Sequence, residues 1–289
     1  MTTSAARATP SAALRLGSVA DLHTHTTASD GLLSPVELVG EATAAGLAAI
    51  AITDHDTVDG IAEATAAAGP GLQVVPGIEL AGTVGPREAH ILGFFVDPTS
   101  PALLRTLAEF RRLRIDRMER FARHLTAAGL PLTLDEILAE ASGGSVGRPH
   151  IARAMIRLGY VETIQTAFEG YLVPGCPTFV PKDEFSPEAC IDVVRSAGGV
   201  AVLAHPFSTG DPDEFALRLA GAGLTGIEVE YGVYDEQRRA VLRDIAARHG
   251  LVATGGSDYH GPEHRENNRL GDGTSPMSTV AELARLAGR

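Results

Sequence analysis

Seven short apolar runs divide most of this chain into a repeating pattern. The runs are rich in Val, Ile and Ala, and most are continuous rather than alternating, which is typical of parallel strands that are buried on both faces. They are Val19–His23, Ala48–Thr53, Leu72–Ile78, His90–Val96, Gly199–Ala204, Gly226–Glu230 and Leu251–Gly255. The pattern therefore predicts seven strands.

Segments with helical signals lie between many of these runs. Ser34–Ala45 has Ser34 as a candidate N-cap, Pro35 at the first helical position, Glu37 at the third, and Gly46 as a stop. Similar segments are Asp59–Ala68, Ser186–Ala197 and Asp235–His249. Strands that alternate with helices predict a closed α/β barrel.

Residues 99–182 interrupt this alternation. Four helical segments follow one another there without a strand signal: Pro101–Ala128, Thr133–Ala141, Arg148–Leu158 and Val161–Leu172. We predict that they form a helical insertion (cap) domain at the barrel mouth, with residues 19–98 and 183–289 forming the barrel domain. Residues 1–18 are predicted to be a disordered tail.

The first helix of the insertion carries an unusual number of arginines. They are Arg105, Arg111, Arg112, Arg114, Arg117, Arg120 and Arg123. One interpretation is a solvated helix face on which partners such as Glu109 and Asp116 neutralise them. The other is that one or two of them bind a substrate phosphate.

Composition narrows the classes of function. The formal net charge of −12 argues against a protein that coats nucleic acid, so no stable DNA binding is expected. No apolar run is long enough to span a membrane. The two cysteines, Cys176 and Cys190, form no CxxC motif and favour a reducing compartment, so a cytoplasmic location is expected.

Histidines and acids recur where the apolar runs meet loops. In α/β barrels the active site forms at the carboxyl ends of the strands. His90 is the exception, because it stands at the start of its run. The candidate set is His23, His25, Asp30, His55, Glu79, His90, His205, Asp258 and His260. This repetition predicts one metal site, assembled from the whole chain.

The residue types in this set indicate the chemistry. Imidazoles and carboxylates without thiolates suit Mn²⁺, Fe²⁺ or Zn²⁺ in an open catalytic site. The candidates are too many for one ion, whereas two or three ions can share Glu79 and Asp258 as bridges. Three divalent ions set against the three acids would leave an excess charge of about +3, which attracts phosphate. A hydroxide that bridges two metals would then hydrolyse a phosphoester.

Plainer interpretations exist for several of these residues. A histidine at a strand end can simply cap a backbone carbonyl. Asp54 and Asp56 either orient metal ligands or stabilise a turn. His150 is a candidate pocket residue, and Gly255-Gly256 is predicted to form a tight turn that lets Asp258 approach the metals.

Most of the candidates lie in six short motifs along the chain. In order, they are Asp21-Leu22-His23-Thr24-His25, Ile52-Thr53-Asp54-His55-Asp56-Thr57, Pro76-Gly77-Ile78-Glu79, His90-Ile91-Leu92-Gly93, Ala204-His205-Pro206 and Gly256-Ser257-Asp258-Tyr259-His260-Gly261. Together these motifs resemble those of the PHP (polymerase and histidinol phosphatase) superfamily. The resemblance covers residues 19 to at least 261. It implies a distorted seven-stranded (β/α) barrel with three divalent ions, of which Mn²⁺ is expected first and Fe²⁺ or Zn²⁺ are alternatives.

The resemblance also assigns ligands to each ion. His23 and His25 would bind the first ion, which Glu79 and Asp258 bridge. A second ion would be bound by Asp30, His55 and His260. The third would be bound by His90 and His205 together with Glu79.

The insertion, with Gly147-Arg148-Pro149-His150 inside it, looks like the subgroup of small-nucleotide phosphatases. The resemblance, and not the spacing, therefore implies a metal-dependent phosphatase whose substrate is a small nucleotide, a nucleoside 3′,5′-bisphosphate first. Arg148 and Lys182 would bind substrate phosphate.

Several alternatives stay open. The substrate can be AMP, a sugar phosphate or the 5′ end of a short RNA, as for a 5′-to-3′ oligoribonuclease. A nonenzymatic, metal-binding regulatory module is a rival of another class. A metal-dependent amide hydrolase is a third, although such barrels usually place a lysine among the ligands, and Lys182 is the only lysine here.

Overall fold

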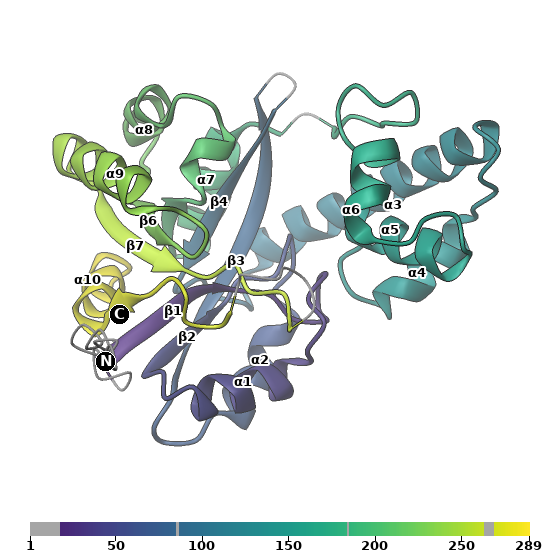
Figure 1. The fold of residues 1–289 in the computed structure, drawn as a ribbon. Coiled ribbons are helices and arrows are strands. Elements are labelled where there is room, and N and C mark those ends of the chain that lie inside the picture. Colours follow the sequence, from purple (N-terminus) through teal and green to yellow (C-terminus); the bar gives the residue numbers. More distant parts are fainter. Residues whose placement is uncertain (1–17, 85–86, 184, 263–268) are drawn as a thin grey trace, which may run out of the picture.

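The centre of this computed structural model is an eight-stranded sheet that curves into a nearly closed barrel (Figure 1). The structure describes residues 18–84, 87–183, 185–262 and 269–289. The predicted disordered tail therefore lies, but for Ser18, outside the described residues. The seven predicted strands are all present: β1 (Val19–Thr24), β2 (Ala49–Ile52), β3 (Gln73–Val84), β4 (Arg87–Phe94), β5 (Val200–Leu203), β6 (Gly226–Tyr231) and β7 (Val252–Gly256). The α/β barrel is thus confirmed.

An eighth strand was not predicted. β8 (Ser275–Pro276) pairs antiparallel with β1 at one end of the sheet, whose order is β7-β6-β5-β4-β3-β2-β1-β8. Two residues that include a proline carry no periodic signal, so this pairing is set only by the fold.

The prediction that the runs are parallel strands is wrong for β4. It pairs antiparallel with both β3 and β5, while β1–β2–β3 and β5–β6–β7 are parallel. Only two residues of sequence separate β3 from β4, too few for the helical crossover that parallel neighbours need. Because β4 runs in the opposite direction, its start lies beside the ends of the other strands. This explains why His90 alone stands at the start of its run.

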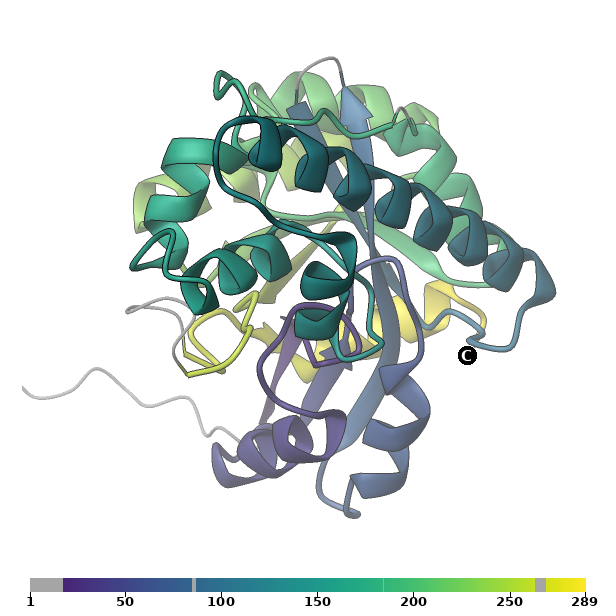
Figure 2. The ribbon, with the colours of Figure 1, turned by 90° about the vertical axis from the view of Figure 1, so that its right-hand side faces the viewer.

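Helices cover the outside of the barrel (Figures 1 and 2). The predicted capping box is present at α1 (Pro35–Ala44), where Ser34 and Glu37 exchange hydrogen bonds. α2 (Gly60–Ala67), α7 (Pro187–Ser196) and α9 (Glu236–His249) match the other predicted segments, whereas α8 (Pro212–Gly221) and α10 (Met277–Leu286) were not predicted.

The segment that follows β7 completes the barrel against β1. Tyr259 forms backbone hydrogen bonds on either side of Thr24: its N donates to His23 O at 3.3 Å, and its O accepts from His25 N at 2.9 Å. The predicted tight turn at Gly255-Gly256 is wrong, because both glycines lie within β7. A Cβ on Gly256 would collide with the Cβ of His23 and lie 2.6 Å from its backbone N. The glycine is therefore needed for close approach of the two strands.

Replacing Gly256 by Ala is expected to destabilise the protein by about 3 kcal/mol or more, because neither strand can move away without opening the barrel. Chemical denaturation measures this change. Gly40→Ala is the matched control, since Gly40 is exposed in α1 and its added Cβ meets nothing within 4 Å. That change should stabilise the helix by up to about 1 kcal/mol. Equal stability of the two variants would contradict the close-approach argument.

The interrupting segment is helical, as predicted. It contains α3 (Pro101–Ala127), α4 (Leu134–Ala141), α5 (Arg148–Arg157) and α6 (Ile164–Ala167), with a π-helical turn at Phe168–Leu172. In place of the predicted helix Val161–Leu172, α6 begins three residues later, at Ile164, because Thr163 caps it.

The long helix α3 joins two apolar cores. Leu103 and Leu107, near its start, pack in the barrel core, whereas Met118 and Phe121 belong to a second core shared with α4 and α5. Figure 2 shows α3 crossing from the barrel into the cap helices. The division into cap and barrel domains stays a prediction. Within the described ranges, no helix is both long and apolar enough to cross a membrane.

Candidate metal centre

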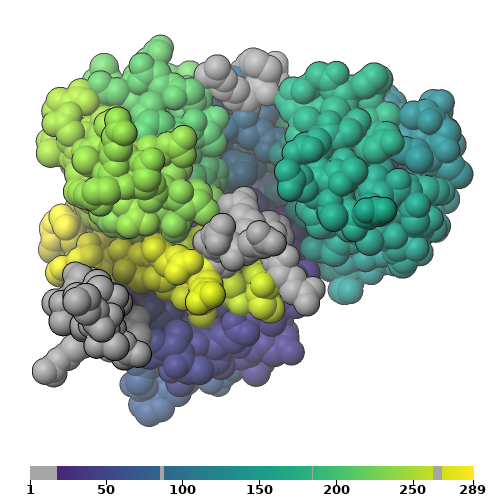
Figure 3. Space-filling model, viewed as in Figure 1, coloured from purple at the N-terminus to yellow at the C-terminus, as the bar shows by residue number. Residues whose placement is uncertain are grey.

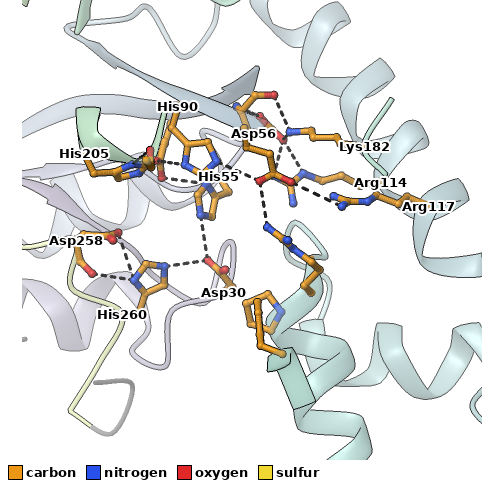
Figure 4. Close-up of a pocket in the computed structure, with 18 of the residues that line it drawn as sticks. Asp30, His55, Asp56, His90, Arg114, Arg117, Lys182, His205, Asp258 and His260 are labelled. Atoms are coloured by element: carbon orange, nitrogen blue, oxygen red, sulfur yellow. Dashed lines mark hydrogen bonds and ion pairs between the residues drawn. The ribbon is translucent and has the colours of Figure 1, made fainter. Parts of the chain in front are cut away.

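All nine candidate side chains converge at one end of the barrel. β1 and the loop after it supply His23, His25 and Asp30, and the other candidates lie on or directly after β2, β3, β4, β5 and β7. Figure 4 shows the rings of His55, His90, His205 and His260 turned toward one shared space, with the carboxylates of Asp30 and Asp258 beside them.

Glu79 lies at the centre of this cluster and is fully buried. Its Oε2 lies 3.3 Å from His23 Nε2, 3.2 Å from His25 Nε2 and 3.0 Å from His55 Nδ1. Its Oε1 lies 2.7 Å from His90 Nδ1 and 3.2 Å from His205 Nε2. One carboxylate thus faces five imidazoles from four other parts of the barrel.

The other two acids complete the arrangement. Asp258 Oδ1 lies 3.2 Å from His25 Nε2 and 3.4 Å from His23 Nε2. Asp30 Oδ1 lies 3.4 Å from His260 Nε2. The possible ligand atoms form three sets, and within each set they lie within 4.8 Å of one another: His23, His25, Glu79 and Asp258; His25, Asp30, His55 and His260; and His55, Glu79 and His90.

These residues fit divalent cations on structural grounds. Several buried polar atoms make no hydrogen bond within the described part of the chain, namely His23 Nε2, both ring nitrogens of His25, Asp30 Oδ1, His55 Nδ1 and Glu79 Oε2. Buried polar atoms without partners are costly, so their concentration at one point requires an explanation. Cations bound among them would supply it. Which residue holds which ion stays a prediction.

The charges of the cluster shift its pKa values strongly. Burial alone would raise the pKa of Glu79, but the neighbouring imidazoles, His55 and His90 first, hold it well below its usual range. Burial would lower the pKa of His25, yet the nearby carboxylates of Asp258 and Glu79 raise it to about 10. For His55 burial prevails and lowers the pKa to about 3. The carboxylates are therefore ionised and ready to bind cations.

Strained backbone accompanies the site. Asp56, His205 and Asp258 have positive φ angles of 51°, 27° and 55°. Such conformations are unfavourable for residues other than glycine and persist where the surrounding structure imposes them. Two of the three are candidate ligands, and Asp56 directly follows His55.

Asp54 and Asp56, for which two roles were open, behave differently. Asp54 accepts hydrogen bonds from Thr26 N, Thr26 Oγ1 and Ser29 Oγ, at 2.6–2.8 Å. It therefore organises the loop that leads to Asp30. Asp56 instead faces the cap, where Arg114 Nε donates to its Oδ2 at 2.6 Å.

A pocket of about 1160 Å³ extends from the cluster toward the cap helices. Figure 3 shows a hollow between the green atoms of the β6–α9 region and the teal atoms of the cap. Besides the cluster, the pocket is lined by basic residues, Arg114, Arg117, Arg148, Lys182 and Arg238. Figure 4 shows Arg114 and Lys182 reaching Asp56 from the cap side. The pocket thus joins a histidine–carboxylate centre to a basic wall.

The two interpretations of the arginine-rich helix concern different residues, and phosphate binding stays a prediction. Arg112 pairs with Glu109 and Asp116 on the solvated face, as the first interpretation predicted. Arg114 and Arg117 lie on the opposite side and line the pocket. Burial lowers the pKa of Arg117 to about 10, so its guanidinium stays charged at neutral pH.

Arg148 and Lys182 both line the pocket, as a substrate-binding role requires. Arg148 pairs with Glu88 at 3.1 Å, and Lys182 Nζ donates to Ala81 O at 2.7 Å. Burial lowers the pKa of Lys182. Their contact with substrate stays a prediction.

His150 does not line this pocket. Its Nδ1 accepts a hydrogen bond from Gly147 N and so caps the start of α5. Burial lowers its pKa to about 4.

Two residues on β6 were missed by sequence reasoning. Glu228 lies 2.9 Å from His23 Nδ1, and Tyr231 Oη donates to Asp258 Oδ2 at 2.8 Å. For Glu228 the available signal was an acid in the middle of the apolar run Gly226–Glu230, a run that had supplied none of the nine candidates.

Comparisons with known proteins agree with this geometry. A family model described as the PHP domain matches residues 21–126. A 3′,5′-nucleoside bisphosphate phosphatase from Chromobacterium violaceum is 37% identical, over 84% of this chain and 87% of its own length. The 5′-3′ exoribonuclease Rnm of Escherichia coli is 35% identical, over 84% of this chain and 85% of its own.

A solved structure from Bifidobacterium adolescentis, described as a metal-dependent phosphoesterase, superposes with a TM-score of 0.84. It is 35% identical and covers 93% of this chain and 98% of its own. Its likeness thus extends over the cap helices as well as the barrel.

Proposed function

The chain belongs to the PHP family and is a metal-dependent phosphoesterase, and on that premise we propose that it hydrolyses a phosphate monoester of a small nucleotide, a nucleoside 3′,5′-bisphosphate first. The observation that carries the proposal is a pocket in which a cluster of imidazoles and carboxylates faces a basic wall. The cluster suits the reacting phosphate, and the wall suits a second anionic group of the same substrate.

The nine clustered residues would hold up to three divalent cations, and Glu79 and Asp258 would be shared between them. When bound, such ions lower the pKa of a water to give a nucleophile and stabilise charge on the phosphoryl oxygens. The chain itself contributes position: neighbouring imidazoles, His55 and His90 first, hold the pKa of Glu79 well below its usual range, and Asp54 holds the loop that leads to Asp30. Phosphoryl transfer depends chiefly on such positioning and electrostatic stabilisation.

The cap, residues 99–182 in our proposed division, supplies most of the basic wall. Its separate apolar core gives Arg114, Arg117 and Arg148 a rigid support opposite the cluster. A guanidinium can bind a phosphate through two parallel hydrogen bonds, which a mononucleotide with one phosphate would use less fully. This supports a substrate that bears two phosphates.

A second candidate is removal of nucleotides from the 5′ end of a short RNA. The size of the pocket favours it, because about 1160 Å³ exceeds what one small ligand needs. The similarity to the exoribonuclease is also nearly equal to that of the phosphatase.

A substrate panel with Mn²⁺ tests the proposal. We expect kcat/KM for 3′-phosphoadenosine 5′-phosphate to exceed that for AMP or ribose 5-phosphate by about tenfold or more, equivalent to about 1.4 kcal/mol. Release of mononucleotides from a five-nucleotide RNA with a comparable kcat/KM would favour the second candidate. No hydrolysis of any member of the panel by the metal-loaded protein would refute both.

A further inference from the structure

We infer that Glu228 is a positioning residue for the metal centre: it sets the ring of His23 and the backbone of His205 at the same time. This inference rests on the proposed function, because it takes the nine-residue cluster to be a metal centre. Glu228 itself does not face the pocket. It would act only through the two histidines.

Glu228 is a carboxylate in the interior of the protein. Only 1% of its surface is exposed, on a strand whose neighbours Ile227 and Val229 are fully buried. A buried carboxylate is costly unless both of its oxygens are paired. Here both are, since Oε1 lies 2.9 Å from His23 Nδ1 and Oε2 accepts from His205 N at 2.7 Å.

The first contact decides which nitrogen of His23 is available. A carboxylate oxygen accepts hydrogen bonds, so Nδ1 carries the hydrogen and Nε2 can keep its lone pair. His23 Nε2 lies 3.3 Å from Glu79 Oε2 and 3.4 Å from Asp258 Oδ1, the two acids placed to bridge ions. Glu228 thus directs the ligating nitrogen of His23 toward the point where the carboxylates meet.

The second contact holds a strained backbone. His205 follows β5 and has φ 27° and ψ 63°, outside the regions that non-glycine residues prefer. The hydrogen bond from its N to Glu228 Oε2 stabilises this conformation, and the ring then places Nε2 3.2 Å from Glu79 Oε1. One carboxylate on β6 therefore links candidate ligands from β1 and β5.

Replacing Glu228 by Gln would keep the shape of the side chain but not its ability to accept both hydrogen bonds. Its amide has one accepting oxygen and one NH₂ group, so it cannot accept from both His23 Nδ1–H and His205 N–H. Either His205 N loses its partner, or His23 takes the other tautomer and turns an N–H toward the ions. Glu230 provides the matched control, because the register shift between Glu228 and Glu230 turns it outward onto Arg239 and Arg243.

Zn²⁺ titration of the full-length protein against a competing chelator tests this role without using catalysis. We expect Glu228→Gln to bind at least one Zn²⁺ about 10- to 100-fold more weakly than wild type. Glu230→Gln should bind like wild type, with thermal unfolding of both variants confirming that they fold. Equal Zn²⁺ affinity of Glu228→Gln and wild type would overturn the inference.

A second test uses the wild type alone, so it does not depend on whether a variant folds. In the Zn²⁺-loaded protein, the imidazole ¹⁵N spectrum should show His23 with a protonated Nδ1 and Zn²⁺ on Nε2. Coordination through Nδ1 would overturn the inference. The two proposals also fail separately: Zn²⁺ binding with this pattern but no phosphatase activity would refute the function alone, whereas an active wild type with an unaffected Glu228→Gln would refute the positioning role alone.

Discussion

Replacing Glu79 by Gln is expected to lower kcat/KM on the preferred nucleotide by on the order of 10³-fold, equivalent to about 4 kcal/mol of transition-state stabilisation. Glu79 is fully buried and faces His23, His25, His55, His90 and His205. Gln fills the same volume, but it removes the negative charge on which these rings converge. Bound metal should fall along with activity, and steady-state kinetics with elemental analysis measures both.

Two controls show whether a loss of activity in Glu79→Gln comes from the metal centre. Circular dichroism should show an unchanged fold, since the change is isosteric. Glu63→Gln, on the exposed face of α2, is the control and should keep full activity and metal. A Glu79→Gln protein with full metal content and activity within tenfold of wild type would contradict the assignment of Glu79 to the metal centre.

Replacing Arg148 by Met is expected to lower kcat/KM for 3′-phosphoadenosine 5′-phosphate by about 10- to 100-fold, the loss of one charge-assisted hydrogen bond. For AMP we expect a change of no more than about threefold, because AMP lacks the second phosphate. Arg148 lines the pocket with its side chain 23% exposed, and it pairs with Glu88 while also contacting Leu172 O. The ratio of the two substrates measures the effect.

Arg105→Met serves as the control for this variant. Arg105 is an exposed residue of α3 and does not line the pocket, so both substrates should be hydrolysed as by wild type. An equal loss on both substrates in Arg148→Met would contradict a contact to the second phosphate. It would place the guanidinium on the reacting phosphate instead.

Local signals were sufficient for most of the secondary structure. The Ser34–Glu37 capping box and the continuous apolar runs are properties of short stretches of chain, and both predicted their elements correctly. Direction is not a local property. A buried strand has the same apolar pattern whether it runs parallel or antiparallel to its neighbours, so β4 was mistaken for a parallel strand. β8 was missed for another reason, because two residues are too few to give a pattern.

The sequence by itself determined the chemistry, because imidazoles and carboxylates at strand ends define a class of metal site wherever the strands meet. Only the tertiary structure decided which of those groups contact one another. It showed that Glu79 lies among five imidazoles, and that Arg114 faces the pocket while Arg112 faces solvent. It also showed that Glu228 contacts His23 and His205, which lie 205 and 23 positions away from it in the sequence. Such contacts depend on distances between remote segments, which exist only after the barrel has closed.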